Sequence, residues 1–383
     1  MKVALIIVLV LSIPAWLILL YDYVYMVIDH LSHYHIGQWK TMEQWQRCVE
    51  RVCRKWAIKT PVLQMRDDYR YLLLDRINGS YGKAMVQSWQ KAGCILGSFA
   101  VNTTDHREFI EEIKKQLLLA NGMWIKEPDK VDYAILAYAL LSCEEDPWSI
   151  KPAMDSMIEC ILKNKCEDGM ISYSAGSCAK RRYVDTLGFV CPFLSLYGKR
   201  FNSKEMTDLA VYQLMKYQDG LTEGLPVHCY TVSDNLPVGI LGWGRGAGWY
   251  ALGLVDTLPN IDDQSQSELI KKYLQNLADV CLKYIHEDGG FNILLQDSGT
   301  RYDSSATAML GYMLACCGKI FKDIRYTSAA EKCLLRLMQV TKMSGVIDEC
   351  QGDTKDIGVF SMQYTAMPFV QGMALRLCAE LSR

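Results

Sequence analysis

Residues 242–256 read GWGRGAGWYALGLVD and carry the strongest local pattern in this chain of 383 residues. The first half alternates glycine with two tryptophans and an arginine, and so many glycines weaken a helix interior. In the second half, Trp249, Leu252 and Val255 recur at helical spacing. The pattern predicts a glycine-rich loop that runs into the start of an apolar helix. Asp256, at the end of the stretch, flanks an outer turn and is expected to face solvent.

The aromatic and basic residues of this loop suit a sugar ligand. Indole rings stack on the apolar faces of sugar rings, and a guanidinium group offers a fixed fork of donors to a carboxylate. Trp243, Arg245 and Trp249 are therefore candidate substrate-binding residues. The same residues also fit a glycine-bent helix start whose tryptophans belong to the hydrophobic core. Taken alone, the stretch leaves both interpretations open.

Glycine turns repeat along the whole chain and break helical patterns about 50 residues apart, a period that holds two helices and their loops. Such dipeptides mark turns with positive φ, often just after a helix ends. The six turns are Asn78-Gly79, Asn121-Gly122, Asp168-Gly169, Asp219-Gly220, Asp288-Gly289 and Ser344-Gly345. Six helical hairpins, each with one apolar face, can bury that face by closing a ring. We predict an all-α fold, a single (α/α)6 toroid, with an open helical solenoid as the alternative.

A polar or small residue precedes each of five apolar helices that follow these turns. These residues are Asp132, Asp185, Gly248, Ser304 and Ser361. In a toroid the five helices would be inner ones, with their N-termini gathered at one rim. Helix N-termini carry partial positive charge and unpaired N–H groups, so this rim favours an anionic ligand. Taken one at a time, the same residues also fit ordinary N-caps.

Composition limits the class of protein. Hydrophobic residues make up 50% of the chain, enough to bury a large core. The formal net charge of −2 and the lack of a basic tract indicate no nucleic-acid partner. The 15 cysteines show no regular spacing, and several lie within apolar patterns as small buried hydrophobes. So many unpaired thiols would be a liability in an oxidising compartment.

An almost unbroken apolar run, residues 3–20, precedes a group of tyrosines. The run is just long enough to span a bilayer, and tyrosines suit the membrane interface. We expect residues 1–35 to form a transmembrane anchor with a juxtamembrane linker, and residues 36–383 to form the toroid outside the cytoplasm. A cleaved signal peptide, and hence a secreted protein, is the alternative. Three histidines follow the run, but no Cys or acidic residue is spaced to complete a metal site with them.

The loop sequence WGRGAGW resembles the WGRGNGW signature of glycoside hydrolase families 88 and 105, the unsaturated uronyl hydrolases. Matching segments follow one another from Gly122 to Leu377. Ala247 stands where the family usually has asparagine, which removes or replaces one polar contact. The resemblance implies the same (α/α)6 toroid, and it implies no metal or organic cofactor.

Two aspartates match catalytic segments of the family. Asp185, in RRYVDTLGFVCPFLSLYG, resembles the general acid/base, and a carboxyl at the mouth of an apolar pocket can hold its proton near neutrality. Arg181 and Arg182 would oppose that effect unless they point elsewhere. Asp132, in KVDYAILAYALL, resembles the second family aspartate, with N-capping as its alternative role.

Three further residues match segments that contact substrate in the family. His228, in GLPVHCYTVSD, is placed to bond a sugar hydroxyl, but Thr231 stands where the family has an aspartate. Asp234 is the nearby carboxylate that would have to orient the imidazole instead. Tyr302 and Ser304 open a segment that matches the start of a family inner helix, which implies a contact with the sugar.

Together these matches imply a hydrolase that removes a 4,5-unsaturated uronic acid from the non-reducing end of an oligosaccharide. In the family mechanism the enzyme hydrates the double bond, so Asp185 gives a proton to C4 and then takes one from the water that attacks C5. Arg245 would pair with the uronate carboxylate between Trp243 and Trp249 as stacking walls. Two alternatives stay open, namely another (α/α)6 carbohydrate-active enzyme acting on a surface polysaccharide, and a membrane-tethered glycan-binding protein without catalysis.

Overall fold

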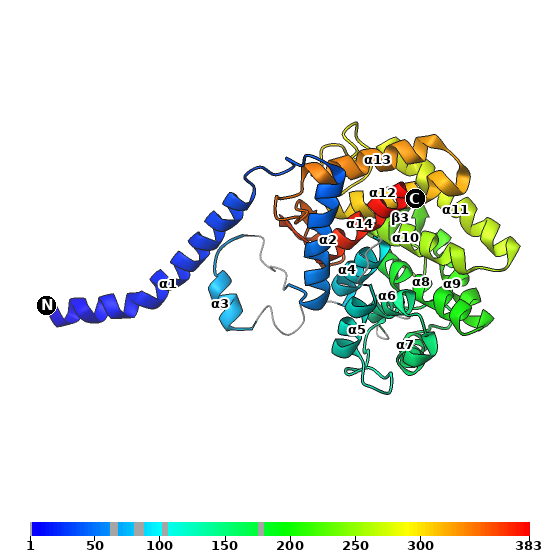
Figure 1. Ribbon diagram of the computed structural model, residues 1–383, viewed down its shortest axis with the longest axis horizontal. Coiled ribbons are helices and arrows are strands. Elements are labelled where there is room, and N and C mark those ends of the chain that lie inside the picture. The colour runs from blue at the N-terminus through cyan, green and yellow to red at the C-terminus, as the bar shows by residue number, and fades with distance from the viewer. Residues whose placement is uncertain (1, 62–67, 80–87, 102–105, 175–179) are drawn as a thin grey trace.

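The computed structural model describes residues 2–61, 68–79, 88–101, 106–174 and 180–383. Six helices form an inner ring in which each packs against the next, and the last returns to the first (Figure 1). They are α4 (Ser88–Ala100), α6 (Ala134–Cys143), α8 (Val184–Arg200), α10 (Gly244–Thr257), α12 (Ser304–Phe321) and α14 (Pro368–Ser382). Because α14 packs on α4, the ring is closed, and the open solenoid is excluded.

A second layer of six helices surrounds the ring. It consists of α2 (Met42–Ile58), α5 (His106–Leu117), α7 (Lys151–Lys163), α9 (Lys204–Lys216), α11 (Gln264–Tyr284) and α13 (Ile324–Gln339). The burial pattern along each helix differs between the two layers. The inner helix α6 is buried almost all round. The outer helix α2 buries only one face, formed by residues at a spacing of four, Trp45, Val49, Cys53 and Ala57. The (α/α)6 toroid predicted from the sequence is confirmed.

Small residues close the ring between α4 and α14. A Cβ atom on Gly93 would lie 2.7 Å from the Cα of Phe369, and a Cβ on Gly372 would overlap the backbone of Gly93. The two backbones therefore touch directly, an approach that only glycine permits. This contact joins the two ends of the toroid.

Five of the six predicted glycine turns have the expected positive φ, at Gly79, Gly122, Gly169, Gly289 and Gly345. The sixth prediction is wrong. Gly220 ends the short 3-10 helix η4 (Tyr217–Gly220), and the positive φ values come later, at Glu223 and Gly224 in the turn between two strands.

The glycine-rich stretch is not a loop, which corrects the sequence-based prediction. Helix α10 begins at Gly244, so Gly244, Gly246 and Gly248 all lie within its first five residues. Their missing side chains make room for neighbours, since a Cβ on Gly244 would lie 2.7 Å from that of Ala306, and one on Gly248 would lie 2.8 Å from that of Met309. Packing against α12 therefore outweighs the low helix propensity of glycine. Ser361 also does not begin an inner helix, because α14 starts at Pro368.

Short strands lie at the rim where the inner helices begin. The strand β3 (Leu225–Thr231) pairs antiparallel with β1 (Arg181–Tyr183), β2 (Leu221–Thr222) and β4 (Pro237–Leu241). Two small ladders join β5 (Cys350–Gln351) to β8 (Tyr364–Thr365) and β6 (Thr354–Asp356) to β7 (Val359–Phe360). The remaining short helices among the described residues are α3 (Leu72–Ile77), η1 (Val131–Tyr133), η2 (Pro147–Ile150) and η5 (Leu258–Asn260).

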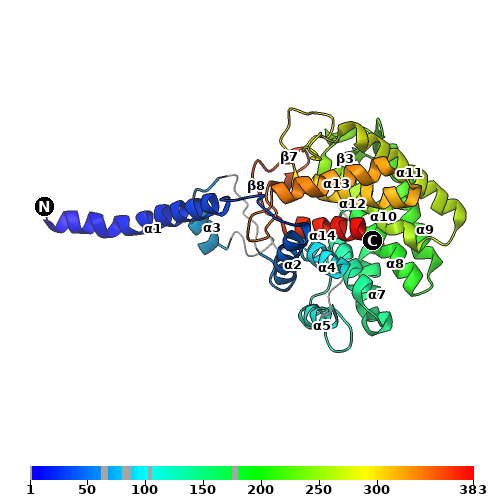
Figure 2. The same ribbon diagram turned by 45° about the horizontal axis from the view of Figure 1, so that its top comes forward.

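Helix α1 (Lys2–Ser32) projects from the toroid in both views (Figures 1 and 2). Residues 10–32 of it form the one described helix that is long and apolar enough to cross a membrane. The last turns of α1, however, contact the rest of the protein. Asp29 accepts a hydrogen bond of 2.7 Å from the Tyr69 hydroxyl, and Lys342 Nζ lies 3.2 Å from Asp29 and 2.7 Å from Asp348. His33 Nε2 lies 2.7 Å from the same Asp348 carboxylate.

A buried ion pair joins three inner helices toward their C-terminal ends. Both terminal nitrogens of Arg376 bond the carboxylate of Asp256 at 2.8 Å, and the Tyr312 hydroxyl lies 3.1 Å from the same carboxylate. Asp256 is 5% exposed, so the expectation that it faces solvent is wrong. Its charge is buried because the partner arginine is supplied by α14, far along the chain.

The cysteines are mostly protected from solvent. Of the free thiols among the described residues, all except Cys48 are buried, and burial raises the pKa of thiols such as Cys191 and Cys281. Cys166 is disulfide-bonded. Because buried thiols with raised pKa values carry little thiolate, they react slowly even in an oxidising compartment.

The glycine contact that closes the ring makes a testable prediction. Gly372→Ala should lower the free energy of unfolding by about 1–3 kcal/mol, because the new methyl group overlaps the α4 backbone. Gly253→Ala in α10 is the matched control, since its Cβ meets nothing closer than 3.1 Å and gains helix propensity. Urea denaturation of both variants measures the difference. Equal stabilities would show that the α4–α14 contact does not limit the packing.

Candidate active site

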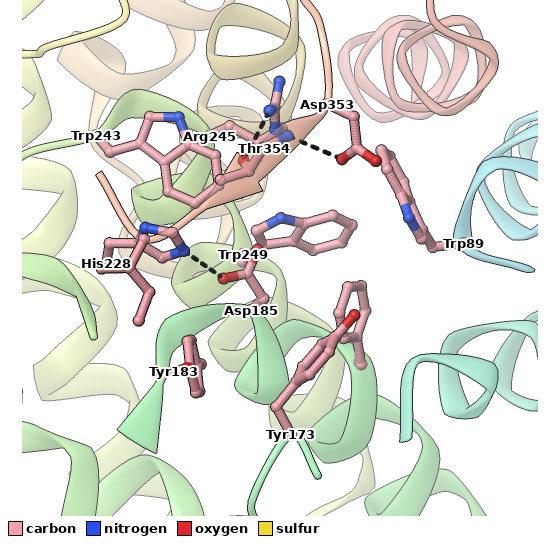
Figure 3. A pocket seen from close by; sticks show the side chains of 12 residues that line it. Trp89, Tyr173, Tyr183, Asp185, His228, Trp243, Arg245, Trp249, Asp353 and Thr354 are labelled. Carbon is pink, nitrogen blue, oxygen red and sulfur yellow. Dashed lines mark hydrogen bonds and ion pairs between the residues drawn. The ribbon is translucent and has the colours of Figure 1, made fainter. Parts of the chain in front are cut away.

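A cavity of about 230 Å³ opens at the rim where the inner helices begin. Aromatic and ionisable side chains line it together (Figure 3). The described lining residues are Trp89, Tyr173, Tyr183, Asp185, Phe189, His228, Trp243, Arg245, Trp249, Asp353, Thr354 and Ile357. Five of the eight residues predicted as site residues are thus brought together, and three lie elsewhere. Lining of this mixed type, apolar with a few convergent polar groups, is typical of a small-ligand site.

Asp185 lies in the first turn of α8, directly after β1. Pairing of Tyr183 with Cys229 brings the start of α8 beside β3, so His228 Nε2 lies 3.6 Å from the Asp185 carboxylate. Burial, with a smaller contribution from the charge of Asp353, raises the pKa of Asp185 to about 7 against the opposing charge of Arg245. The carboxyl group can therefore hold a proton near neutral pH and also release it.

The two arginines before Asp185 do not oppose this shift. The Arg182 guanidinium turns away and lies 2.7 Å from the Asp168 carboxylate, where it is buried. The charge that lowers the pKa of Asp185 comes from Arg245 instead. The ion pair of Arg182 with Asp168 thus removes the conflict that the sequence left open.

His228 is held on β3 by aromatic neighbours. Its ring centroid lies 4.8 Å from that of Trp243 and 5.8 Å from that of Phe360. Asp234 does not orient the imidazole, because it is exposed and bonds Thr231 at the β3–β4 turn. The carboxylate beside His228 is Asp185 itself, 3.6 Å from the Nε2 atom of the imidazole.

Arg245 is buried and both of its terminal nitrogens bond protein oxygens, so its pairing with a uronate stays a prediction. One terminal nitrogen donates to the Gln351 carbonyl at 2.7 Å and to Ser305 Oγ at 3.3 Å. The other donates to the Gly352 carbonyl at 2.9 Å and to Thr354 Oγ1 at 3.4 Å. The guanidinium group therefore fastens the segment from Gln351 to Thr354 over the start of α10.

The two tryptophans of the glycine-rich stretch both line the cavity but differ in their surroundings. Trp249 is packed between Phe189 and Phe369, with ring centroids at 4.7 and 4.8 Å, so its faces belong largely to the core. Trp243 donates its indole N–H to Gln351 Oε1 at 3.0 Å. Ala247, the departure from the family signature, is fully buried and does not line the cavity.

Asp132 lies beside the cavity without lining it. It sits in η1, just before α6, and is 6% exposed. Burial raises its pKa to about 6, and its Oδ1 atom has no hydrogen-bond partner among the described residues. The Ser88 hydroxyl bonds its backbone carbonyl at 3.2 Å. Asp132 is thus a second carboxyl group that holds a proton more readily than usual.

Tyr302 and Ser304 are not among the described residues that line the cavity, so their contact with the sugar stays a prediction. Ser304 is fully buried and its hydroxyl donates to the backbone carbonyl of Asp348 at 2.5 Å. The guanidinium carbon of Arg336 lies 4.3 Å from the centre of the Tyr302 ring. Both residues therefore position the segment that leads to the cavity.

Several cavity residues were missed from the sequence. Trp89, Tyr173 and Tyr183 supply aromatic walls, while Asp353 lies between β5 and β6 and Thr354 begins β6. Tyr183 had a local signal, since it precedes Asp185 by two residues. Asp353 lay in a polar stretch with no periodicity, which the sequence pattern could not connect to the rim.

Comparisons with known proteins agree with this geometry. The family model described as Glycosyl Hydrolase Family 88 matches residues 82–383. The unsaturated rhamnogalacturonyl hydrolase YesR of Bacillus subtilis (strain 168) is 23% identical over 212 residues. That match spans 53% of this chain and only 60% of the relative.

Two solved structures share the fold. One is a possible member of the GH105 family from Klebsiella pneumoniae subsp. pneumoniae MGH 78578, with a TM-score of 0.73, 18% identity and coverage of 90% of this chain and 94% of that one. The other is the unsaturated glucuronyl hydrolase of Bacillus sp. GL1, with a TM-score of 0.64, 15% identity and coverage of 89% and 95%. With the family match covering most of the chain, this protein is a hydrolase that belongs to Glycosyl Hydrolase Family 88.

Proposed function

We propose that this protein removes a 4,5-unsaturated uronic acid residue from the non-reducing end of an oligosaccharide by hydrating its C4=C5 bond. The observation that carries the proposal is the Asp185 carboxyl group, which is 18% exposed and holds a proton near neutrality inside an aromatic-lined cavity. The names of the relatives, an unsaturated rhamnogalacturonyl and an unsaturated glucuronyl hydrolase, support the same class of substrate.

The reaction begins with proton transfer from Asp185 to C4 of the bound sugar. The double bond is consumed, and positive charge develops at C5, where the ring oxygen shares it. Water then attacks C5, and the Asp185 carboxylate takes one of its protons, which restores the starting acid. The hemiketal formed at C5 opens, and the former anomeric carbon releases the rest of the oligosaccharide. One group serving as acid and then base needs a pKa near the working pH, as found here.

Other cavity residues have supporting roles. His228, 3.6 Å from Asp185, is placed to hold the attacking water or a sugar hydroxyl. Asp132 lies next to the site with a buried oxygen and a raised pKa, so we propose that it bonds a hydroxyl of the same sugar. The aromatic walls exclude bulk water, which keeps the Asp185 carboxyl group protonated until substrate binds. The cavity is smaller than the usual range of about 300–1,000 Å³ for drug-sized ligands and suits one sugar ring.

Replacing the acid tests the mechanism. Asp185→Asn should lower kcat on unsaturated uronyl disaccharides by about 10²–10⁴-fold, because the amide cannot donate the proton to C4. Loss of the ultraviolet absorbance of the C4=C5 bond follows the reaction. Asp219→Asn, in an exposed pair with Lys216 on the outer layer, is the matched control and should behave as the native protein. Native activity in Asp185→Asn would refute the assignment.

The raised pKa of Asp185 also predicts a pH-dependent stability. Between about pH 4 and pH 7 the folded chain keeps this proton and the unfolded chain does not, so the free energy of unfolding falls as pH rises. Asp185→Asn removes the free-energy cost of ionising this buried carboxyl group in the folded protein. At about pH 8 the variant should be more stable than the native protein by about 2–4 kcal/mol, and near pH 4 the gain should vanish.

Denaturant unfolding at both pH values measures this difference. A gain of equal size at both would show that the variant acts through packing. No gain at either pH would show that the Asp185 carboxyl group has an ordinary pKa in the folded protein.

We propose that residues 3–20 anchor the protein in a membrane, with the domain of residues 36–383 outside the cytoplasm. By hydropathy alone, the candidate membrane-spanning part of α1 runs from residue 10 to residue 32. From Asp22 onward, however, α1 is bound to protein, because the Asp22 carboxylate accepts the backbone N–H groups of Tyr71 and Leu72 at 2.6 and 3.0 Å. Such contacts belong outside the hydrocarbon layer.

Membrane fractionation tests this boundary. The full chain should sediment with membranes and need detergent for release, whereas a chain lacking residues 2–20 should remain soluble and folded. Mass spectrometry of the expressed protein should find the N-terminal run intact. A soluble native protein whose mature N-terminus begins after the apolar run would establish a cleaved signal peptide instead.

A further inference from the structure

Helix α1 joins the toroid at the rim where the cavity opens. Lys342, in the segment between α13 and β5, lies 3.2 Å from the Asp29 carboxylate of α1 and 2.7 Å from that of Asp348. His33, just after α1, adds a contact of 2.7 Å to Asp348. The Lys342 and Asp348 side chains are only 8% and 4% exposed. Because breaking a buried ion pair is costly, this joint fixes the direction in which α1 leaves the toroid.

The segment between α1 and α2 is bound at the same place. Gly37 donates its backbone N–H to the Thr341 carbonyl at 3.0 Å, and the Trp39 indole N–H donates to the same oxygen at 3.2 Å. The Trp45 indole N–H donates to the Thr341 hydroxyl at 2.9 Å. A free linker would let the toroid turn in any direction relative to α1. Held at Thr341, this segment keeps the two in one arrangement.

The joint and the cavity belong to one stretch of chain. The Asp348 backbone carbonyl accepts the Ser304 hydroxyl at 2.5 Å, at the start of α12. Three residues later the Gln351 N–H donates to Asp303 at 3.0 Å, and Asp353 then lines the cavity. Residues 348–353 therefore lead from the joint directly to the cavity wall.

The cavity opens on the side of the toroid from which α1 projects. In both views α14 runs away from α1 toward the C-terminus that ends it (Figures 1 and 2). Figure 2 shows the rim strands β7 and β8 between α1 and the inner helices. Because the inner helices begin at one rim, that rim faces the side of α1. The part of α1 outside the proposed membrane span, residues 22–32, is a stalk of about 15 Å at about 1.5 Å per residue.

Side chains suited to a membrane interface lie on this side. The guanidinium carbon of Arg76 in α3 lies 5.8 Å from the ring centres of both Tyr21 and Tyr25, at the end of the proposed span. On the rim, Val359 and Met362 are 50% and 75% exposed. Arginine, tyrosine and exposed apolar side chains are suited to the boundary between lipid headgroups and hydrocarbon. The partner that fits this side of the protein is a lipid surface.

We propose that the cavity faces the bilayer that holds α1, and that the protein acts on glycans whose reducing end is attached to a lipid of the same bilayer. The inference rests on the proposed anchor and the proposed hydrolysis, and it names the substrate class of that site. A dissolved sugar would reach the cavity in any orientation of the toroid. A fixed orientation matters for a sugar held at the same surface, since confinement of both partners raises their effective concentration.

Energy transfer tests the orientation without any turnover. The full chain is placed in vesicles with acceptor dyes on the lipid headgroups, and a donor dye is attached at Met362→Cys on the rim or at Ile324→Cys. Ile324 begins α13 at the opposite end of the toroid and is 72% exposed. Cys48→Ser removes the one free thiol among the described residues that is not buried.

Transfer from position 362 should exceed that from position 324 at least about twofold, because α12, with 18 residues, separates the two ends by about 27 Å. Equal transfer, or stronger transfer from position 324, would overturn the proposal.

Turnover in vesicles tests the substrate class. An unsaturated uronyl disaccharide is linked to a lipid through a short spacer, and loss of its ultraviolet absorbance is followed with the full chain in the same vesicles or in separate ones. Turnover in the same vesicles should be at least about tenfold faster. Asp29→Ala, which breaks the joint on the α1 side, should reduce this advantage and leave turnover of the dissolved disaccharide unchanged.

The dissolved disaccharide separates failure of this inference from failure of the proposed function. If it is consumed while the lipid-linked sugar in the same vesicles is not, the membrane-facing cavity is refuted and the hydrolysis stands. If neither sugar is consumed, the hydrolysis and the substrate class are both refuted, and the transfer ratio still decides the orientation.

Discussion

The buried guanidinium group of Arg245 is the constraint on which the site depends. A cation removed from water must be matched by acceptors, and here the acceptors are the carbonyls of Gln351 and Gly352 together with two hydroxyls. Those bonds hold the segment from Gln351 to Thr354 over the start of α10, although it lies more than 100 residues further along the chain. They also fix the Gln351 amide that bonds Trp243, and they bring Asp353 to the cavity. The glycines of α10 make this close packing possible, since larger residues would overlap α12 and its flanking segment.

This arrangement explains how one carboxyl group can serve as both acid and base. Asp185 lies at an inner-helix N-terminus, where N–H groups favour the charged form, but burial among aromatic rings favours the neutral form and dominates. Arg245 lowers the pKa again, while its partner Asp353 raises it. The result is an acid poised near neutrality. The toroid contributes by gathering the starts of α8, α10 and α12 at one rim, so residues far apart in the chain meet in a small cavity.

The features that could be predicted from the sequence are those that depend on local residue patterns. Helical periodicity and the repeated glycine turns predicted the toroid, and the apolar helix behind Asp185 predicted a carboxyl group with a raised pKa. What could not be predicted depends on contacts between distant segments. The partners of Arg245, the burial of Asp256 by Arg376 and the position of Tyr302 and Ser304 outside the described cavity lining all follow from packing across the ring. Asp353 lay in an aperiodic stretch, so nothing local connected it to the rim.

The central claim is that Asp185 acts on the double bond and not on the anomeric carbon. A substrate in which sulfur replaces the glycosidic oxygen tests this most directly, because hydration at C4 and C5 does not require the linkage to break first. The measurement is loss of the C4=C5 absorbance for matched oxygen-linked and sulfur-linked unsaturated disaccharides. The account predicts that both are consumed at comparable rates and that Asp185→Asn consumes neither. Consumption of the oxygen-linked sugar alone would contradict hydration and indicate displacement at the anomeric carbon.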